Sequence, residues 1–243
     1  MWFDLLVFAA ALGGGVIAGV AGFGIGSLLT PAFALQMDAR LAVAAVSVPH
    51  AVGTAFRLWM LGGRLDPKVL RSFGLTSALG GLSGALLQGR APTQALLMLF
   101  GLLLIVTAAA ELTGLSRRMR FSGVMAPVAG AASGVLGGLV GNQGSIRSAA
   151  LLGTNLSKAV FVGTATAVAL MVDAARLPVY LWRGHEQLAD VTGWLWIATG
   201  GVLAGTLIGM RVLQWIPEAA FRRTVGVLLG LLGAAMIVGG MEE

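Results

Sequence analysis

The sequence predicts an all-α polytopic membrane protein with about eight transmembrane segments in two four-segment repeats. Composition is the first observation: 57% of the 243 residues are hydrophobic, 11% are charged, and the mean hydropathy is +0.90. Soluble domains carry about twice that share of charged residues. The second observation is a pair of glycine-rich breaks, one in each half of the chain, within apolar segments. The chain is therefore expected to cross a membrane several times and to be interrupted twice.

Eight apolar segments follow one another along the chain. They cover residues 3–35, 41–61, 72–87, 93–112, 124–152, 159–172, 191–210 and 224–241. A helical crossing needs about 20 residues, so the shorter segments extend into their flanks, thin the bilayer locally or fail to cross. The N-terminus carries Asp4 and has no basic residue before the run that continues into the glycine-rich break. We therefore expect a membrane segment there rather than a cleaved signal peptide.

The first and fifth segments are predicted to be split into half-helices by their glycine-rich loops. Unwound backbone at membrane depth survives only where it lines a cavity, and paired breaks of this kind indicate the binding site of a secondary transporter. A shift of 117 residues lays Gly24 on Gly141 and Asp38 on Asn155. The sequence thus predicts a first repeat over 1–115 and a second over 121–243. If all eight segments cross, the Lys and Arg in the loops decide little; if one segment between the halves re-enters without crossing, they favour an inverted second repeat.

Glycine pairs four residues apart predict close helix packing. Examples are Gly15 with Gly19 and Gly134 with Gly138, which would lie on one helix face and let two backbones approach. Such faces would also allow a homo-oligomer or a non-transporting assembly partner.

Several functional classes are disfavoured by the residue content. The formal charge of +6 comes from Lys and Arg in short loops, where they set membrane topology, so we expect no nucleic-acid partner. Zero cysteines exclude disulfides and thiolate-bound metal. Paired carboxylates, a histidine-rich cluster and a phosphate-binding Gly-Lys-Ser motif are all missing from the sequence. We therefore expect no enzyme activity, no metal and no cofactor.

The second break offers many hydrogen-bond donors. It contains Gly141, Asn142, Gln143, Gly144, Ser145 and Arg147. Backbone N–H groups at the start of a half-helix, two side-chain amides, a hydroxyl and a guanidinium all suit a small oxyanion, and no acid lies in the loop. The alternative is a tight turn near the surface, with Arg147 reaching a lipid headgroup.

The first break is neutral and offers mainly backbone donors. Its candidate binding residues are Gly24, Gly26 and Ser27. If the two breaks face each other near the membrane midplane, the first supplies backbone N–H groups and the second supplies charge.

Segment 41–61 carries polar residues on one helix face. Ser47, His50, Thr54 and Arg57 are spaced three, four and three residues apart. His50 is a candidate proton relay, with a structural hydrogen bond as the alternative. Arg57 is a candidate anion ligand, with snorkelling to the interface as the alternative. Asp173 follows the end of segment 159–172 and is expected to be interfacial.

Two related stretches resemble a known family. The first has a glycine-rich break, an apolar stretch with Pro31, and then Asp38-Ala39-Arg40-Leu41-Ala42-Val43-Ala44; the second has Gly141-Asn142-Gln143-Gly144-Ser145 and then Leu156-Ser157-Lys158-Ala159-Val160. This pattern resembles the TauE/SafE family of membrane permeases over nearly the whole chain. The resemblance implies a transporter of the bacterial inner membrane that moves sulfite, sulfoacetate or another small sulfur oxyanion.

The residues and the resemblance together predict a secondary transporter. A small anion would bind between the two half-helices, and the repeats would move against each other to alternate access. A passive anion channel and a membrane assembly partner are the alternatives.

Overall fold

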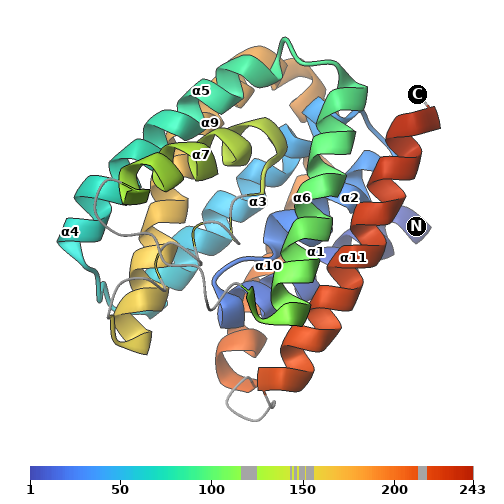
Figure 1. Ribbon diagram of the computed structural model, residues 1–243. Coiled ribbons are helices and arrows are strands. Elements are labelled where there is room, and N and C mark those ends of the chain that lie inside the picture. The colour runs from blue at the N-terminus through green and yellow to red at the C-terminus, as the bar shows by residue number, and fades with distance from the viewer. Residues whose placement is uncertain are drawn as a thin grey trace.

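The computed structural model describes residues 1–115, 125–142, 144, 147, 151, 156–212 and 218–242. Every regular element in these ranges is a helix. Six of the described helices are long and apolar enough to cross a membrane. They are α1 (Trp2–Ala21), α3 (Ala39–Met60), α6 (Thr93–Thr113), α9 (Lys158–Asp190), α10 (Thr192–Val212) and α11 (Glu218–Glu242). The all-α membrane class predicted from composition is confirmed (Figure 1).

Shorter helices complete the described bundle. They are α2 (Ile25–Ala34), α4 (Pro67–Val69), the π-helical turn η1 (Leu70–Gly74), α5 (Leu75–Gln88) and α7 (Met125–Val140). From α4 to α5 the helical run is continuous, so this segment is longer than the predicted 72–87. Asp66 starts the run, because its carboxylate accepts the N–H groups of Lys68 and Val69 and Pro67 has no N–H to satisfy.

Helix α9 corrects the prediction of a segment over 159–172. It continues to Asp190, with one non-helical residue at Gly184. Asp173 and Arg176 interrupt the apolar run in the sequence, but they bind each other within the protein and the helix passes through them. Asp173 therefore lies inside a helix and is fully buried, which makes its predicted interfacial position wrong.

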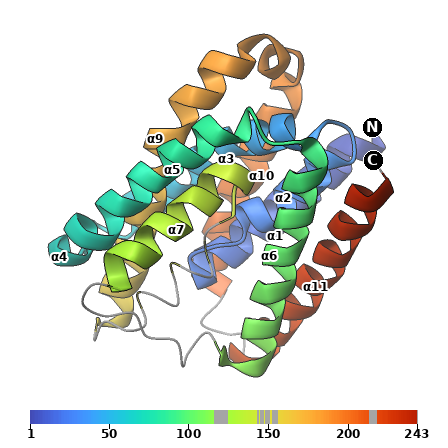
Figure 2. The same cartoon turned by 45° about the horizontal axis from the view of Figure 1, so that its top comes forward.

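Three helix pairs pack closely through glycine. Helices α1 and α10 run parallel, as do α5 and α7, while α6 and α11 run antiparallel (Figures 1 and 2). A Cβ on Gly15 would lie 2.5 Å from the carbonyl oxygen of Val202, and one on Gly134 would collide with the carbonyl of Ser77. Close packing at these glycines is confirmed.

Helices α1 and α7, which precede the two breaks, each end at a glycine with positive φ. Helix α1 ends at Ala21, where Gly22 has φ 78° and its N–H reaches the carbonyl of Ala18. Helix α2 then returns along α1, since a Cβ on Gly14 would lie 3.0 Å from the Cα of Ile25. Helix α7 ends at Val140, followed by Gly141 with φ 74°. Only glycine adopts these angles without strain, so the sequence fixes where both helices stop.

Candidate functional site

Four charged side chains are buried within the described part of the bundle. Arg57 and Arg147 are 2% exposed, Arg176 is 1% exposed and Asp173 is 0% exposed. The segments outside the described residues add no Asp or Glu between positions 116 and 217. Three buried guanidiniums therefore face one buried carboxylate. Burying charge is costly unless it is paired, so this imbalance points to a missing negative charge.

Asp173 binds one partner on each of two helices. Its Oδ2 lies 2.7 Å from His50 Nδ1 of α3, and its Oδ1 accepts Arg176 Nε at 3.0 Å on α9. The imidazole of His50 is 12% exposed. His50 and Asp173 are 123 residues apart in the chain, and their contact joins the two halves.

Arg176 and Tyr180 hold the end of α7. Arg176 Nη1 donates to the carbonyl of Gly137 at 2.5 Å, and the Tyr180 hydroxyl donates to the carbonyl of Gly138. The last four carbonyl groups of a helix have no N–H partner within that helix. Side chains of α9 therefore cap α7 immediately before its break at Gly141.

Arg57 lies beside the first break with all three of its nitrogens engaged. Its Nε donates to Thr166 Oγ1 at 3.0 Å, its Nη1 to the carbonyl of Ala18 at 2.6 Å, and its Nη2 to the carbonyl of Gly22 at 3.4 Å. The alternative in which Arg57 snorkels to the interface is wrong, because the protein itself offers these acceptors at the end of α1.

Arg147 reaches the same carbonyl from the second break. Its Nη2 donates to Gly22 O at 2.8 Å, while its Nε and Nη1 have no partner among the described residues. The Nδ2 of Asn142 and the hydroxyl of Thr30 are likewise buried and unpaired there. Because Arg147 is buried, the alternative in which it reaches a lipid headgroup is wrong. Two like charges at one oxygen, with two unpaired donors on Arg147 itself, would be stabilised by an anion.

The two breaks are in contact. A Cβ on Gly26 would lie 2.5 Å from the carbonyl oxygen of Gly141, and one on Gly144 would collide with Phe23. Gly24 has φ 134° and is buried, and Ser27 is buried beside it in α2. The structure thus brings the predicted residues of the two breaks and both arginines together. Gln143 and Ser145 lie outside the described residues.

His50 belongs to a neighbouring group that sequence reasoning only half identified. Its partner Asp173 is followed along α9 by Arg176, which binds Asp173, and then by Tyr180, at spacings of three and four residues. That spacing marks one helix face and would have indicated these residues if 173–190 had been taken as helix. Among the described residues, no group of three or more His, Cys, Asp or Glu is placed to hold a metal ion.

Membrane-length helices around buried cationic side chains define a polytopic membrane transport protein. The chain belongs to the sulfite exporter TauE/SafE family, which matches it over residues 7–236. This match confirms the family resemblance predicted from the sequence. No curated protein and no solved structure gives a significant match to the chain.

Proposed function

We propose that this protein is a secondary transporter of a small sulfur oxyanion or organosulfonate, held between the two chain breaks by Arg147. One observation carries the proposal: Arg147 is 2% exposed, lies with Arg57 at the carbonyl of Gly22, and keeps two nitrogens unpaired within the described residues. The family name, sulfite exporter, supports a sulfur oxyanion as the substrate class.

An oxyanion would satisfy these groups together. Nε and Nη2 share one edge of a guanidinium and form a fork that matches two oxygens of the same anion, so the second N–H of Arg147 Nη2 would complete the fork with Nε. Asn142 Nδ2 and the Thr30 hydroxyl are further buried donors without partners in the described part of the chain. A dianion would also balance the excess of buried guanidiniums over carboxylates.

The proposed architecture comprises two inverted repeats, 1–115 and 121–243, of four membrane segments each. Supporting this, α1 of the first half pairs in parallel with α10 of the second, and α7 of the second pairs in parallel with α5 of the first. In this proposal α2 is the half-helix that follows the first break, and access alternates as the repeats move against each other. The site of action would be the bacterial inner membrane.

Ligand-induced stabilisation of the purified protein tests the substrate class. Sulfite, thiosulfate, sulfate, sulfoacetate, taurine and chloride are compared by thermal shift. A ligand at 100 times its Kd stabilises the native state by about 2.7 kcal/mol. We expect one of the sulfur oxyanions to stabilise the protein more than chloride does.

Arg147 variants test the site. Arg147→Ala should abolish the stabilisation, and Arg147→Lys should weaken binding roughly 10-fold, because it keeps the charge and loses the fork. Arg71→Ala, at an exposed position, is the matched control. Unchanged sulfite affinity in folded Arg147→Ala would refute the assignment. Accelerated exchange of labelled for unlabelled substrate across proteoliposomes would separate a transporter from a passive channel.

A further inference from the structure

A cavity of ≈ 310 Å³ lies apart from the buried site, at the end of the bundle where α3 and α6 begin and α5 ends. The remaining wall is α9 around Gly184, where the helix leaves its regular geometry. At about 30 Å³ for each water molecule, this volume holds a small ion with part of its hydration shell.

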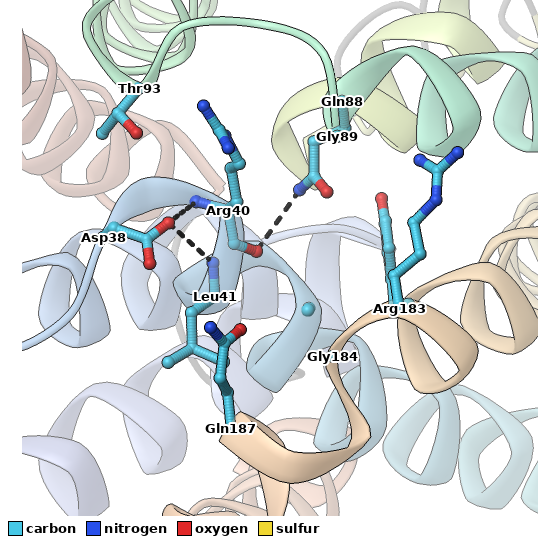
Figure 3. Close-up of a pocket in the computed structure, with 11 residues that line it drawn as sticks. Asp38, Arg40, Leu41, Gln88, Gly89, Thr93, Arg183, Gly184 and Gln187 are labelled. Atoms are coloured by element: carbon cyan, nitrogen blue, oxygen red, sulfur yellow. Dashed lines mark hydrogen bonds between the residues drawn. The ribbon is translucent and has the colours of Figure 1, made fainter.

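Two arginines face this cavity from different helices (Figure 3). Arg40 Nε donates to the carbonyl of Ala91 at 3.1 Å, and Arg183 Nη1 donates to the carbonyls of Ala85 and Leu86 at 3.3 and 2.9 Å. These bonds orient both side chains. They leave both terminal nitrogens of Arg40, and Nε and Nη2 of Arg183, without a hydrogen-bond partner in the described part of the chain.

The acidic residue in the cavity wall is already engaged. Asp38 Oδ1 accepts the N–H groups of Arg40 and Leu41 at 2.9 and 3.2 Å, as the N-cap of α3. Gln88 and Gln187 add amide groups to the lining. The cavity therefore presents two guanidiniums, side-chain amides and one carboxylate whose Oδ1 accepts backbone N–H groups, so its cationic groups outnumber the acidic one. This set favours an oxyanion.

One face of α9 connects the cavity to the buried charges. Arg183 and Tyr180 line the cavity, Arg176 follows one turn further in, and Asp173 lies beyond it. Tyr180 is 3% exposed and its hydroxyl donates to the carbonyl of Gly138, at the end of α7. Along this face of α9, Tyr180 thus lies between Arg183 in the cavity lining and the buried Arg176.

We propose that this cavity is an outer binding site for the transported oxyanion, in which Arg40 and Arg183 collect the anion before it passes Tyr180. The proposal rests on the proposed function, because it names the entrance for the same substrate. A lipid phosphate shares this chemistry with a free oxyanion, so the experiment has to separate the two sources.

The chain contains no cysteine, so single-cysteine variants need no altered background. Thr93→Cys places a thiol in the cavity wall, and Thr192→Cys places one at an exposed position just beyond α9, outside the lining. Each variant is reconstituted in nanodiscs and reacted with an anionic sulfonate-bearing thiosulfonate reagent or its cationic trimethylammonium analogue. The measured quantity is the ratio of the two rates.

We expect the ratio of the anionic to the cationic labelling rate to be roughly tenfold higher at Thr93→Cys than at Thr192→Cys. A cleft lined by one sign of charge raises the encounter rate of counter-ions. Adding Arg40→Gln and Arg183→Gln should remove this preference, and sulfoacetate, which does not react with thiosulfonates, should slow the labelling at Thr93→Cys. Equal ratios at the two cysteines, or a preference that survives both substitutions, would overturn the proposal.

The lipid arm uses nanodiscs of phosphatidylcholine alone or with added phosphatidylglycerol. Slower labelling in the presence of sulfoacetate, in nanodiscs of phosphatidylcholine alone, supports the soluble anion. If phosphatidylglycerol itself slows the labelling of Thr93→Cys and the soluble anion does not, the cavity is a lipid headgroup site and the proposal is overturned. The labelling ratio should persist in an Arg147→Ala background, so loss of the buried site and loss of the cavity site are scored separately.

Discussion

Asp173 neutralises part of a buried cationic centre and holds one residue from each half of the chain. Removing one member of a buried ion pair leaves its partner uncompensated, at a cost of about 3–5 kcal/mol. Asp173→Asn should therefore lower the free energy of unfolding by about that amount, measured by denaturation of the purified protein. Asp190→Asn, at the exposed end of α9, is the control and should change little. Equal stability of both variants would show that the Asp173 contacts carry no net stabilisation.

Arg57 and Arg147 are similarly buried but differ in how their donors are used. All three nitrogens of Arg57 have protein acceptors, whereas one nitrogen of Arg147 has an acceptor among the described residues. Arg57→Gln should therefore lower the Tm of the ligand-free protein more than Arg147→Gln does. Conversely, Arg147→Gln should lose more of the Tm increase caused by sulfite. A thermal-shift titration of both variants measures the two effects, and the opposite ranking in either measurement would contradict this division of roles.

At the scale of the elements, contact between the two breaks depends on glycine, which has no side chain, at position 26. A Cβ on Gly26 would lie 2.5 Å from the carbonyl oxygen of Gly141. Gly26→Ala should therefore force α2 away from the end of α7 and reduce sulfite uptake into proteoliposomes at least tenfold, because small misplacements at a binding site are amplified in rate. Gly200→Ala in α10 meets open space and is the control. Uptake by Gly26→Ala at the control rate would show that the contact is not needed.

The helices and the breaks could be predicted from sequence because they depend on local signals. The apolar run 41–61 gave α3 (Ala39–Met60) to within two residues, and glycines with positive φ occur at the expected ends of α1 and α7. The course of α9 was not predictable from hydropathy, because Asp173 and Arg176 lower the apolar signal and are compensated only by each other. The pairing of Asp173 with His50 spans 123 residues and has no local signature.

For the molecule as a whole, the contact between His50 and Asp173 joins α3 of the first half to α9 of the second. Movement of one proposed repeat against the other would strain or break this contact. Protonation adds a positive charge to the imidazole and strengthens its attraction to the carboxylate. The two conformations would then bind a proton differently, and a difference of this kind is what couples a proton to a conformational change.

His50→Gln tests this coupling, because the amide can keep a hydrogen bond to Asp173 but does not titrate near neutral pH. The substrate is sulfoacetate, whose charge stays fixed near neutral pH, so that only the protein titrates. Flux into proteoliposomes is measured against pH and against an imposed proton gradient. We expect the wild type to respond to both and His50→Gln to respond to neither. The chain has two histidines, and His185, whose side chain is 74% exposed, provides the matched control His185→Gln. If wild type, His50→Gln and His185→Gln give the same pH profile and the same response to the gradient, His50 is a structural link between the two halves and another group carries the coupling.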